Sequence, residues 1–132
     1  MKYYLSDAGG AGLIFFVYGV IVLFIVLAIL LEAAVMIAMK YNIRFKKAAL
    51  DSTIINVASL VVGFILLEYF EDFITSYTPL NFLILYIITV VIESWLLYLL
   101  NKTKPFKQTL KVTLVMNLIS YLLLFFMTRI GE

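Results

Sequence analysis

The stretch from Ala11 to Met39, AGLIFFVYGVIVLFIVLAILLEAAVMIAM, decides the fold class of this chain. Its only charged residue is Glu32. As an α-helix the stretch would be about 43 Å long at about 1.5 Å per residue, which exceeds a bilayer hydrocarbon core of about 30 Å. It therefore predicts a transmembrane helix that tilts across the bilayer or protrudes from it.

The composition of the whole chain supports the same class. Of its 132 residues, 65% are hydrophobic and only 14% are charged, whereas soluble domains average about half apolar and about a quarter charged residues. A single core of this size cannot hide so much apolar surface from water. We therefore expect an integral membrane protein.

Cysteine and histidine are both absent, which excludes several kinds of chemistry. Without cysteine the chain can form no disulfide, no thiolate nucleophile and no cysteine-ligated zinc site. Without histidine it lacks the commonest general base and metal ligand, and a Ser-His-Asp triad is impossible. We expect that the protein is not an enzyme and uses no cofactor. Whether it binds a metal ion does not follow from the sequence.

Three further apolar runs follow the first, separated by short polar connections. Pro79 and Pro105 lie at two of the connections, where they indicate breaks between helices. The runs lack the residue-by-residue alternation of membrane β-strands. We expect an all-α integral membrane protein with a single domain, residues 1–132, and four transmembrane helices at approximately 11–39, 52–70, 80–100 and 109–128.

The distribution of charge indicates an orientation in the membrane. Eight of the ten basic residues lie in the first and third connections, 40–51 and 101–111, whereas the second carries Glu68, Glu71 and Asp72 and no basic residue. Because cytoplasmic loops concentrate Lys and Arg, we expect both basic connections to be cytoplasmic and both termini extracytoplasmic, in the plasma (inner) membrane. The basic connections are also candidates for binding anionic lipid headgroups.

Polar residues recur in the two halves of the chain at one constant spacing. A shift of 61 residues superposes Glu32 on Glu93, Asn56 on Asn117, Ser59 on Ser120 and Ser52 on Thr113. Polar matches inside apolar runs are hard to obtain by chance. We interpret the chain as two tandem helical hairpins, residues 11–71 and 72–132. Each contains an even number of spans, so the repeats are parallel and related by an axis along the membrane normal.

The polar residues of each hairpin are expected to lie at one depth. Glu32 is about 12 Å before Lys40, and Asn56 is about 13 Å beyond Lys47, at about 1.5 Å per residue. The second hairpin repeats these distances. In both hairpins, helical spacing places the polar residues on common helix faces, which is typical of packed membrane helices. We predict one polar layer in the cytoplasmic half of the bilayer. Its candidate ligand- or ion-binding residues are Glu32, Asn56, Ser59, Glu93, Asn117 and Ser120, and its supporting polar faces carry Ser52, Thr89 and Thr113.

Two carboxyl groups in one dry layer are costly and repel each other. We therefore expect that at least one of Glu32 and Glu93 is protonated at neutral pH, or that a cation lies between them. Asparagine suits either state, since its amide donates to a carboxylate and its oxygen accepts from a carboxylic acid.

Two functions fit such a layer. The first is a small cation or proton transporter or channel, which would require a homo-oligomer because four helices leave little room for a pore. The alternative is a non-transporting accessory or scaffold subunit of a membrane complex, in which the layer only fixes helix packing. The expected surroundings are the lipid bilayer and further copies or membrane partners, and no feature indicates nucleic acid. Neither the substrate nor the oligomeric state follows from the sequence.

Overall fold

The computed structural model describes the backbone of residues 2–75 and 79–129, and the side chains of most residues from 12 onward. The described chain is helical almost throughout and contains no strand. Its helices are α1 (Lys2–Ala38), α2 (Phe45–Thr75), α3 (Pro79–Leu100) and α4 (Phe106–Arg129). The middle of the second predicted connection, 76–78, and the predicted C-terminal end, 130–132, lie outside the described residues.

All four predicted helices are present, but they begin earlier than predicted. Helix α1 already starts at Lys2, and α2 starts at Phe45 rather than at 52. Polar composition alone does not stop a helix, because Lys, Ala and Leu are all good helix formers. The two basic connections therefore shrink to the loops 39–44 and 101–105.

Three of the helices contain a stretch that is long and apolar enough to cross a membrane. Among the described residues these stretches are Ile14–Ala38, Phe45–Phe70 and Leu83–Leu100. Helix α4 is not among them, which is one fewer than predicted. Lys107 and Lys111 lie in its first two turns, so its uncharged part begins only at Val112.

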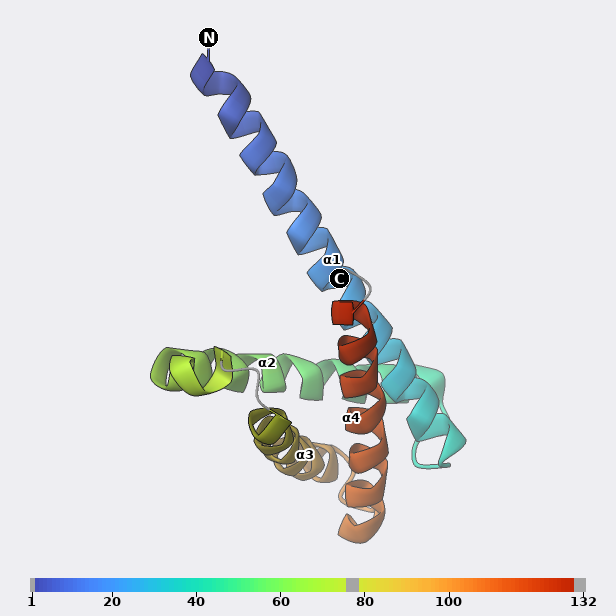
Figure 1. Cartoon of the computed structure of the whole chain (residues 1–132). Coiled ribbons are helices and arrows are strands. Elements are labelled where there is room, and N and C mark those ends of the chain that lie inside the picture. The colour runs from blue at the N-terminus through green and yellow to red at the C-terminus, as the bar shows by residue number, and fades with distance from the viewer. Residues whose placement is uncertain (1, 76–78, 130–132) are drawn as a thin grey trace.

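The helices pack in a ring and spread apart from one end (Figure 1). Helix α1 packs against α2 and α4, and α3 packs against the same two helices. Within the described residues, the diagonal pairs α1/α3 and α2/α4 make no close backbone contact. The helices converge near the loops 39–44 and 101–105, which we call the loop end, and the N-terminal half of α1 extends alone beyond the others. The bundle is therefore splayed rather than parallel.

The hydrophobic core lies near the loop end, where the helices are closest. It is built around Met36, Tyr41, Ile55, Leu97 and Met116, all fully or almost fully buried. Small side chains in the same cluster, Ala33 and Ala48, allow the helices to approach closely.

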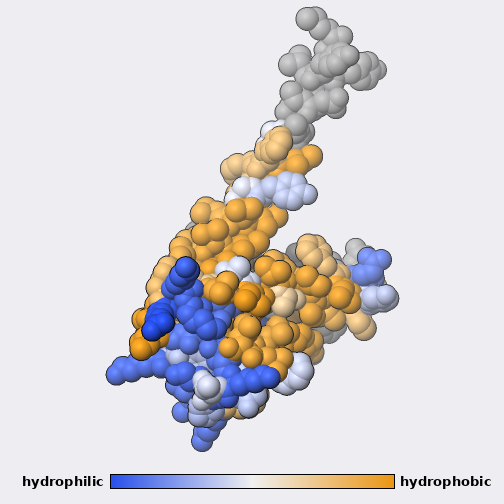
Figure 2. All heavy atoms as spheres, turned by 180° about the vertical axis from the view of Figure 1, so that it is seen from behind, coloured by the Kyte–Doolittle hydropathy of each residue, from blue (hydrophilic) through white to orange (hydrophobic). Residues whose placement is uncertain are grey.

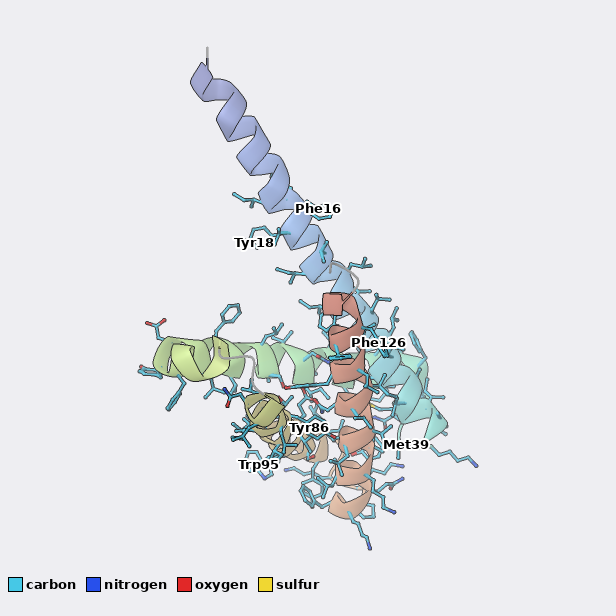
Figure 3. All side chains as sticks on the ribbon, in the orientation of Figure 1. Phe16, Tyr18, Met39, Tyr86, Trp95 and Phe126 are labelled. Atoms are coloured by element: carbon cyan, nitrogen blue, oxygen red, sulfur yellow. The ribbon has the colours of Figure 1, made fainter. Side chains whose placement is uncertain are left out.

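The outer surface is hydrophobic above a hydrophilic loop end. Figure 2 shows hydrophilic residues gathered around the two loops, a smaller hydrophilic group at the far end of α2, and a broad hydrophobic surface between them. Phe16 and Tyr18 project from the isolated half of α1, and Trp95 and Phe126 project from α3 and α4 (Figure 3). All four side chains are more than half exposed. Such a surface is consistent with a membrane protein whose helices contact lipid.

Two backbone features set where the helices end. Lys40 has a left-handed conformation with φ 54°, and beyond it the amide of Tyr41 donates to the carbonyl of Met36 at 2.8 Å while that of Lys40 donates to Ile37 at 3.0 Å. This is the Schellman pattern of a helix C-terminus, and it turns Tyr41 back into the core. In α2, a non-helical φ/ψ at Phe70 (−137°, 38°) interrupts the helix where its apolar stretch ends.

Candidate functional site

Glu32 lies on the inner side of α1 and is almost fully buried, with 2% of its surface exposed. One carboxylate oxygen, Oε2, accepts hydrogen bonds from Ser52 Oγ at 2.6 Å and from Asn56 Nδ2 at 2.5 Å. The other, Oε1, accepts from Ser120 Oγ at 3.0 Å. Glu32 of α1 thus takes hydrogen bonds from both α2 and α4.

Glu93 occupies the corresponding place on α3 and is equally buried, at 2% exposed. Its Oε2 accepts from Asn117 Nδ2 at 2.7 Å, and its Oε1 accepts from Ser59 Oγ at 2.6 Å. Each glutamate therefore takes one amide from the asparagine that follows it in the chain. Each also accepts a hydrogen bond from a serine of the opposite half of the chain: Glu32 from Ser120, and Glu93 from Ser59.

We call the contacts of Ser59 with Glu93 and of Ser120 with Glu32 the crossed serine bonds. One joins α2 to α3 and the other joins α4 to α1. The shift of 61 residues found in the sequence relates the two pairs, because it takes Ser59 to Ser120 and Glu32 to Glu93. Sequence periodicity predicted the glutamate–asparagine pairs but not this exchange of serines.

The asparagines are held in place by their own helices. The amide of Asn56 also donates to the carbonyl of Ser52 at 2.9 Å, and that of Asn117 donates to the carbonyl of Thr113 at 3.1 Å. Each amide group thus bridges a backbone carbonyl one turn earlier and a carboxylate on a neighbouring helix. The side chains reach the glutamates in a fixed orientation.

Of the three predicted supporting residues, the serine hydrogen-bonds a glutamate, whereas the two threonines hydrogen-bond their own helices. Ser52 joins the site directly through Glu32. Thr113 donates to the carbonyl of Thr109 at 3.0 Å, and Thr89 donates to that of Leu85 at 2.8 Å, a bond to the preceding turn that is common for threonine in apolar helices. Neither threonine has a hydrogen bond to a glutamate among the described contacts.

A cavity of about 380 Å³ lies between the helices, and all six predicted site residues line it. These are Glu32, Asn56, Ser59, Glu93, Asn117 and Ser120. The remaining wall is mostly apolar, with Phe24 from α1, Leu60 and Phe64 from α2, and Leu85 and Ile88 from α3. The cavity therefore has a polar end with two carboxyl groups and a long apolar wall.

Among the described residues, no basic side chain lines this cavity. The described hydrogen-bond donors to both glutamates are neutral hydroxyls and amides. Within residues 2–75 and 79–129, no group of three or more acidic, cysteine or histidine side chains could hold a metal ion. The arrangement is chemically suited to taking up protons or a single positive charge at the two carboxyl groups.

Asp51 forms a second buried polar cluster that the sequence analysis did not predict. Its Oδ2 accepts from Asn42 Nδ2 at 2.6 Å and from Asn101 Nδ2 at 2.8 Å, and its Oδ1 pairs with the ammonium of Lys47. We call this the Asp51 cluster. It ties the two loops together, and a bond of 2.8 Å between Tyr41 Oη and Thr109 Oγ1 adds a further link.

One sequence signal could have drawn attention to Asp51. It is the only acidic residue between Glu32 and Glu68, and it follows Lys47 by four residues, the spacing of an ion pair within a helix. The two asparagines could not have been predicted in this way, because they reach Asp51 from loops far apart in the chain.

Comparisons with known proteins do not assign the chain to a class: no protein family, no curated protein and no solved structure matches it. The described residues define an all-helical protein in which three helices are suited to crossing a membrane. Two buried carboxyl groups line a cavity between its helices.

Proposed function

We propose that the protein is a small multi-pass membrane transporter or channel for protons or another cation. Glu32 and Glu93 bear the charge, and Asn56, Ser59, Asn117 and Ser120 are the neutral ligands. The observation that carries this proposal is that both glutamates, each almost fully buried, line one cavity that has no basic side chain among its described lining residues. Ionisable groups of this kind inside membrane helices mark ion or proton pathways.

The proposal includes a duplicated four-span architecture, with α4 as the fourth crossing. The symmetry of the crossed serine bonds supports two parallel hairpins related by an axis along the membrane normal. The hydrophilic loop end in Figure 2 supports placing both loops at one membrane surface, and their basic residues favour the cytoplasmic side. The packed core at the loop end leaves no room for a continuous pore in one copy, which favours a homo-oligomer.

The alternative function is that of a non-transporting accessory or scaffold subunit. The observation in its favour is that every glutamate oxygen already accepts a hydrogen bond, and that these bonds tie all four helices together. Such a layer could serve helix packing alone.

Flux measurements on purified protein in liposomes separate the two functions. We expect proton or alkali-cation flux in the parent, a loss of at least about tenfold in Glu32→Gln and Glu93→Gln, and unchanged flux in Glu68→Gln, which alters an exposed glutamate outside the cavity. A folded parent with no flux under a proton, Na⁺ or K⁺ gradient would rule out transport and favour the accessory role.

A further inference from the structure

The size of the cavity is the first guide to what occupies it. At about 380 Å³ it is far larger than the roughly 30 Å³ that one water molecule occupies, and it falls within the range of small-molecule sites, about 300–1,000 Å³. A proton or a bare metal ion would fill only a small part of it. The volume fits an organic molecule.

The lining is divided into two parts of opposite character. The two carboxyl groups, with their asparagines and serines, form one end, and the side chains of Phe24, Leu60, Phe64, Leu85 and Ile88 form much of the remaining wall. A ligand that satisfies both parts needs a polar head and an apolar body. An inorganic ion would leave the apolar wall without a partner.

The charge of the site restricts the head group. The described lining contains two glutamates and no basic side chain, so an anionic head is repelled and a cationic head is attracted. A carboxylate offers about four acceptor positions; Glu32 uses three of them and Glu93 uses two. Glu93 therefore retains the greater capacity for a positively charged head.

The position of the apolar wall indicates how a ligand would enter. Leu60 and Phe64 of α2 line the cavity, and their side chains are 43% and 70% exposed. The helices diverge away from the loop end (Figure 1), whereas the buried core and the Asp51 cluster lie at the loop end. The cavity thus reaches the hydrophobic exterior between the helices.

We propose that the cavity binds an amphipathic organic monocation, with an ammonium-type head at Glu93 and Glu32 and an apolar body along α2 and α3, which enters laterally from the lipid. This inference rests on the cation-binding role proposed for the same site and specifies its substrate class.

Gly63 provides a variant that fills the cavity without touching the carboxyl groups. It lines the cavity, and a Cβ added there meets no atom within 4 Å. Gly63→Leu should therefore fold and occupy the space meant for the apolar body. Gly19 in α1 is a matched control, because an added Cβ there is equally free of contacts and Gly19 does not line the cavity.

The probe is benzyltrimethylammonium, compared with its neutral carbon isostere neopentylbenzene and with tetramethylammonium, which is the head without the body. Binding to the protein in nanodiscs is measured by titration calorimetry. We expect the parent to bind benzyltrimethylammonium at least about tenfold more tightly than either comparison compound. Glu93→Gln and Gly63→Leu should each weaken that binding at least about tenfold, and Gly19→Leu should leave it unchanged.

The outcomes distinguish this inference from the proposed function. Equal affinity for the neutral isostere, or no loss of binding in Gly63→Leu, would overturn the substrate class. Glutamate-dependent proton or alkali-cation flux without benzyltrimethylammonium binding would overturn the inference and leave transport standing. Charge-selective binding without flux of any ion would support the ligand class and overturn transport.

Discussion

Three carboxyl groups are buried among the described residues, and their surroundings differ. Asp51 has a cationic partner in Lys47, together with two asparagine amides. Glu32 and Glu93 have only neutral donors and border a cavity. A buried carboxylate that has a counter-ion suits a structural role. Two buried carboxylates that have no counter-ion suit the binding of a positive charge.

Removing the Asp51 side chain should destabilise the protein strongly. Asp51→Ala leaves the amides of Asn42 and Asn101 buried at the loop end without their acceptor. Since an unsatisfied buried group costs about 1–3 kcal/mol, we expect the free energy of unfolding to fall by about 3 kcal/mol, measured by chemical unfolding in detergent. Glu68→Ala, at an exposed site, should have little effect. Equal stability of the two variants would contradict a structural role for Asp51.

Tyr41 should make stability depend on alkaline pH. Burial raises the pKa of Tyr41 above its ordinary value of 10.0, and the charge of Asp51 raises it further, although the bond with Thr109 acts in the opposite direction. The folded protein therefore holds this proton more tightly than the unfolded chain. Its contribution is complete below about pH 10 and is lost as the pH rises through the higher folded pKa.

Unfolding measured between pH 8 and pH 11 tests this expectation. The parent should lose stability above pH 10, whereas Tyr41→Phe, which has no phenol, should lose less. At pH 8 the variant should be less stable by about 1 kcal/mol, because it lacks the hydrogen bond with Thr109. Parallel pH profiles for the two proteins would show that Tyr41 does not carry the effect.

Among the elements, α1 is followed by a turn in which one residue type is unfavourable for its backbone conformation. Lys40 is the only described non-glycine residue with a positive φ, and an L-residue there costs about 1–2 kcal/mol relative to glycine. The cost is offset by the backbone bonds of the Schellman turn and by the burial of Tyr41 against the core.

Lys40→Gly should therefore stabilise the protein by about 1 kcal/mol, seen as a higher unfolding temperature in detergent. Lys102→Gly is the control: it also removes one basic charge from a loop, but at a position without a positive φ, and it should give no gain. Similar gains in both variants would mean that charge, and not backbone conformation, determines the difference.

The elements also show what the sequence could predict and what it could not. Apolar runs gave the number and order of the helices, and counting residues from the basic loops placed Glu32 level with Asn56, because both features are local in sequence. The crossed serine bonds and the Asp51 cluster depend on how one hairpin packs against the other, which no local pattern determines. Polarity does not predict the early starts of α1 and α2, because Lys and Ala favour a helix even where the sequence becomes polar.

For the whole molecule, the main property is the contrast between its two ends. Both loops and the core lie at the loop end, whereas the opposite end spreads into separate helices (Figure 1). Exposed Glu68 lies on α2 far from the loops, and exposed Lys102 lies in the second loop. In the proposed orientation these two residues face opposite sides of the membrane.

The absence of cysteine makes this orientation directly testable. Single variants Glu68→Cys and Lys102→Cys are treated in intact cells with a membrane-impermeant maleimide. We expect Glu68→Cys to react at once and Lys102→Cys to react only after the membrane is permeabilised. The reverse pattern would invert the topology, and labelling of both positions in intact cells would exclude a fixed orientation across the membrane.

The crossed serine bonds have a consequence for how the molecule responds to its own protonation. Each glutamate accepts a hydrogen bond from a serine of the opposite hairpin, so a carboxyl group that is neutralised or engaged by a ligand weakens one of the two glutamate–serine contacts between the hairpins. Occupancy of the glutamates and separation of the hairpins are then thermodynamically linked, and the linkage acts equally in both directions. In the proposed membrane role, a force that pulls the hairpins apart would change the affinity of the glutamates for positive charge, and lateral tension in the bilayer would then act as an effector of the site.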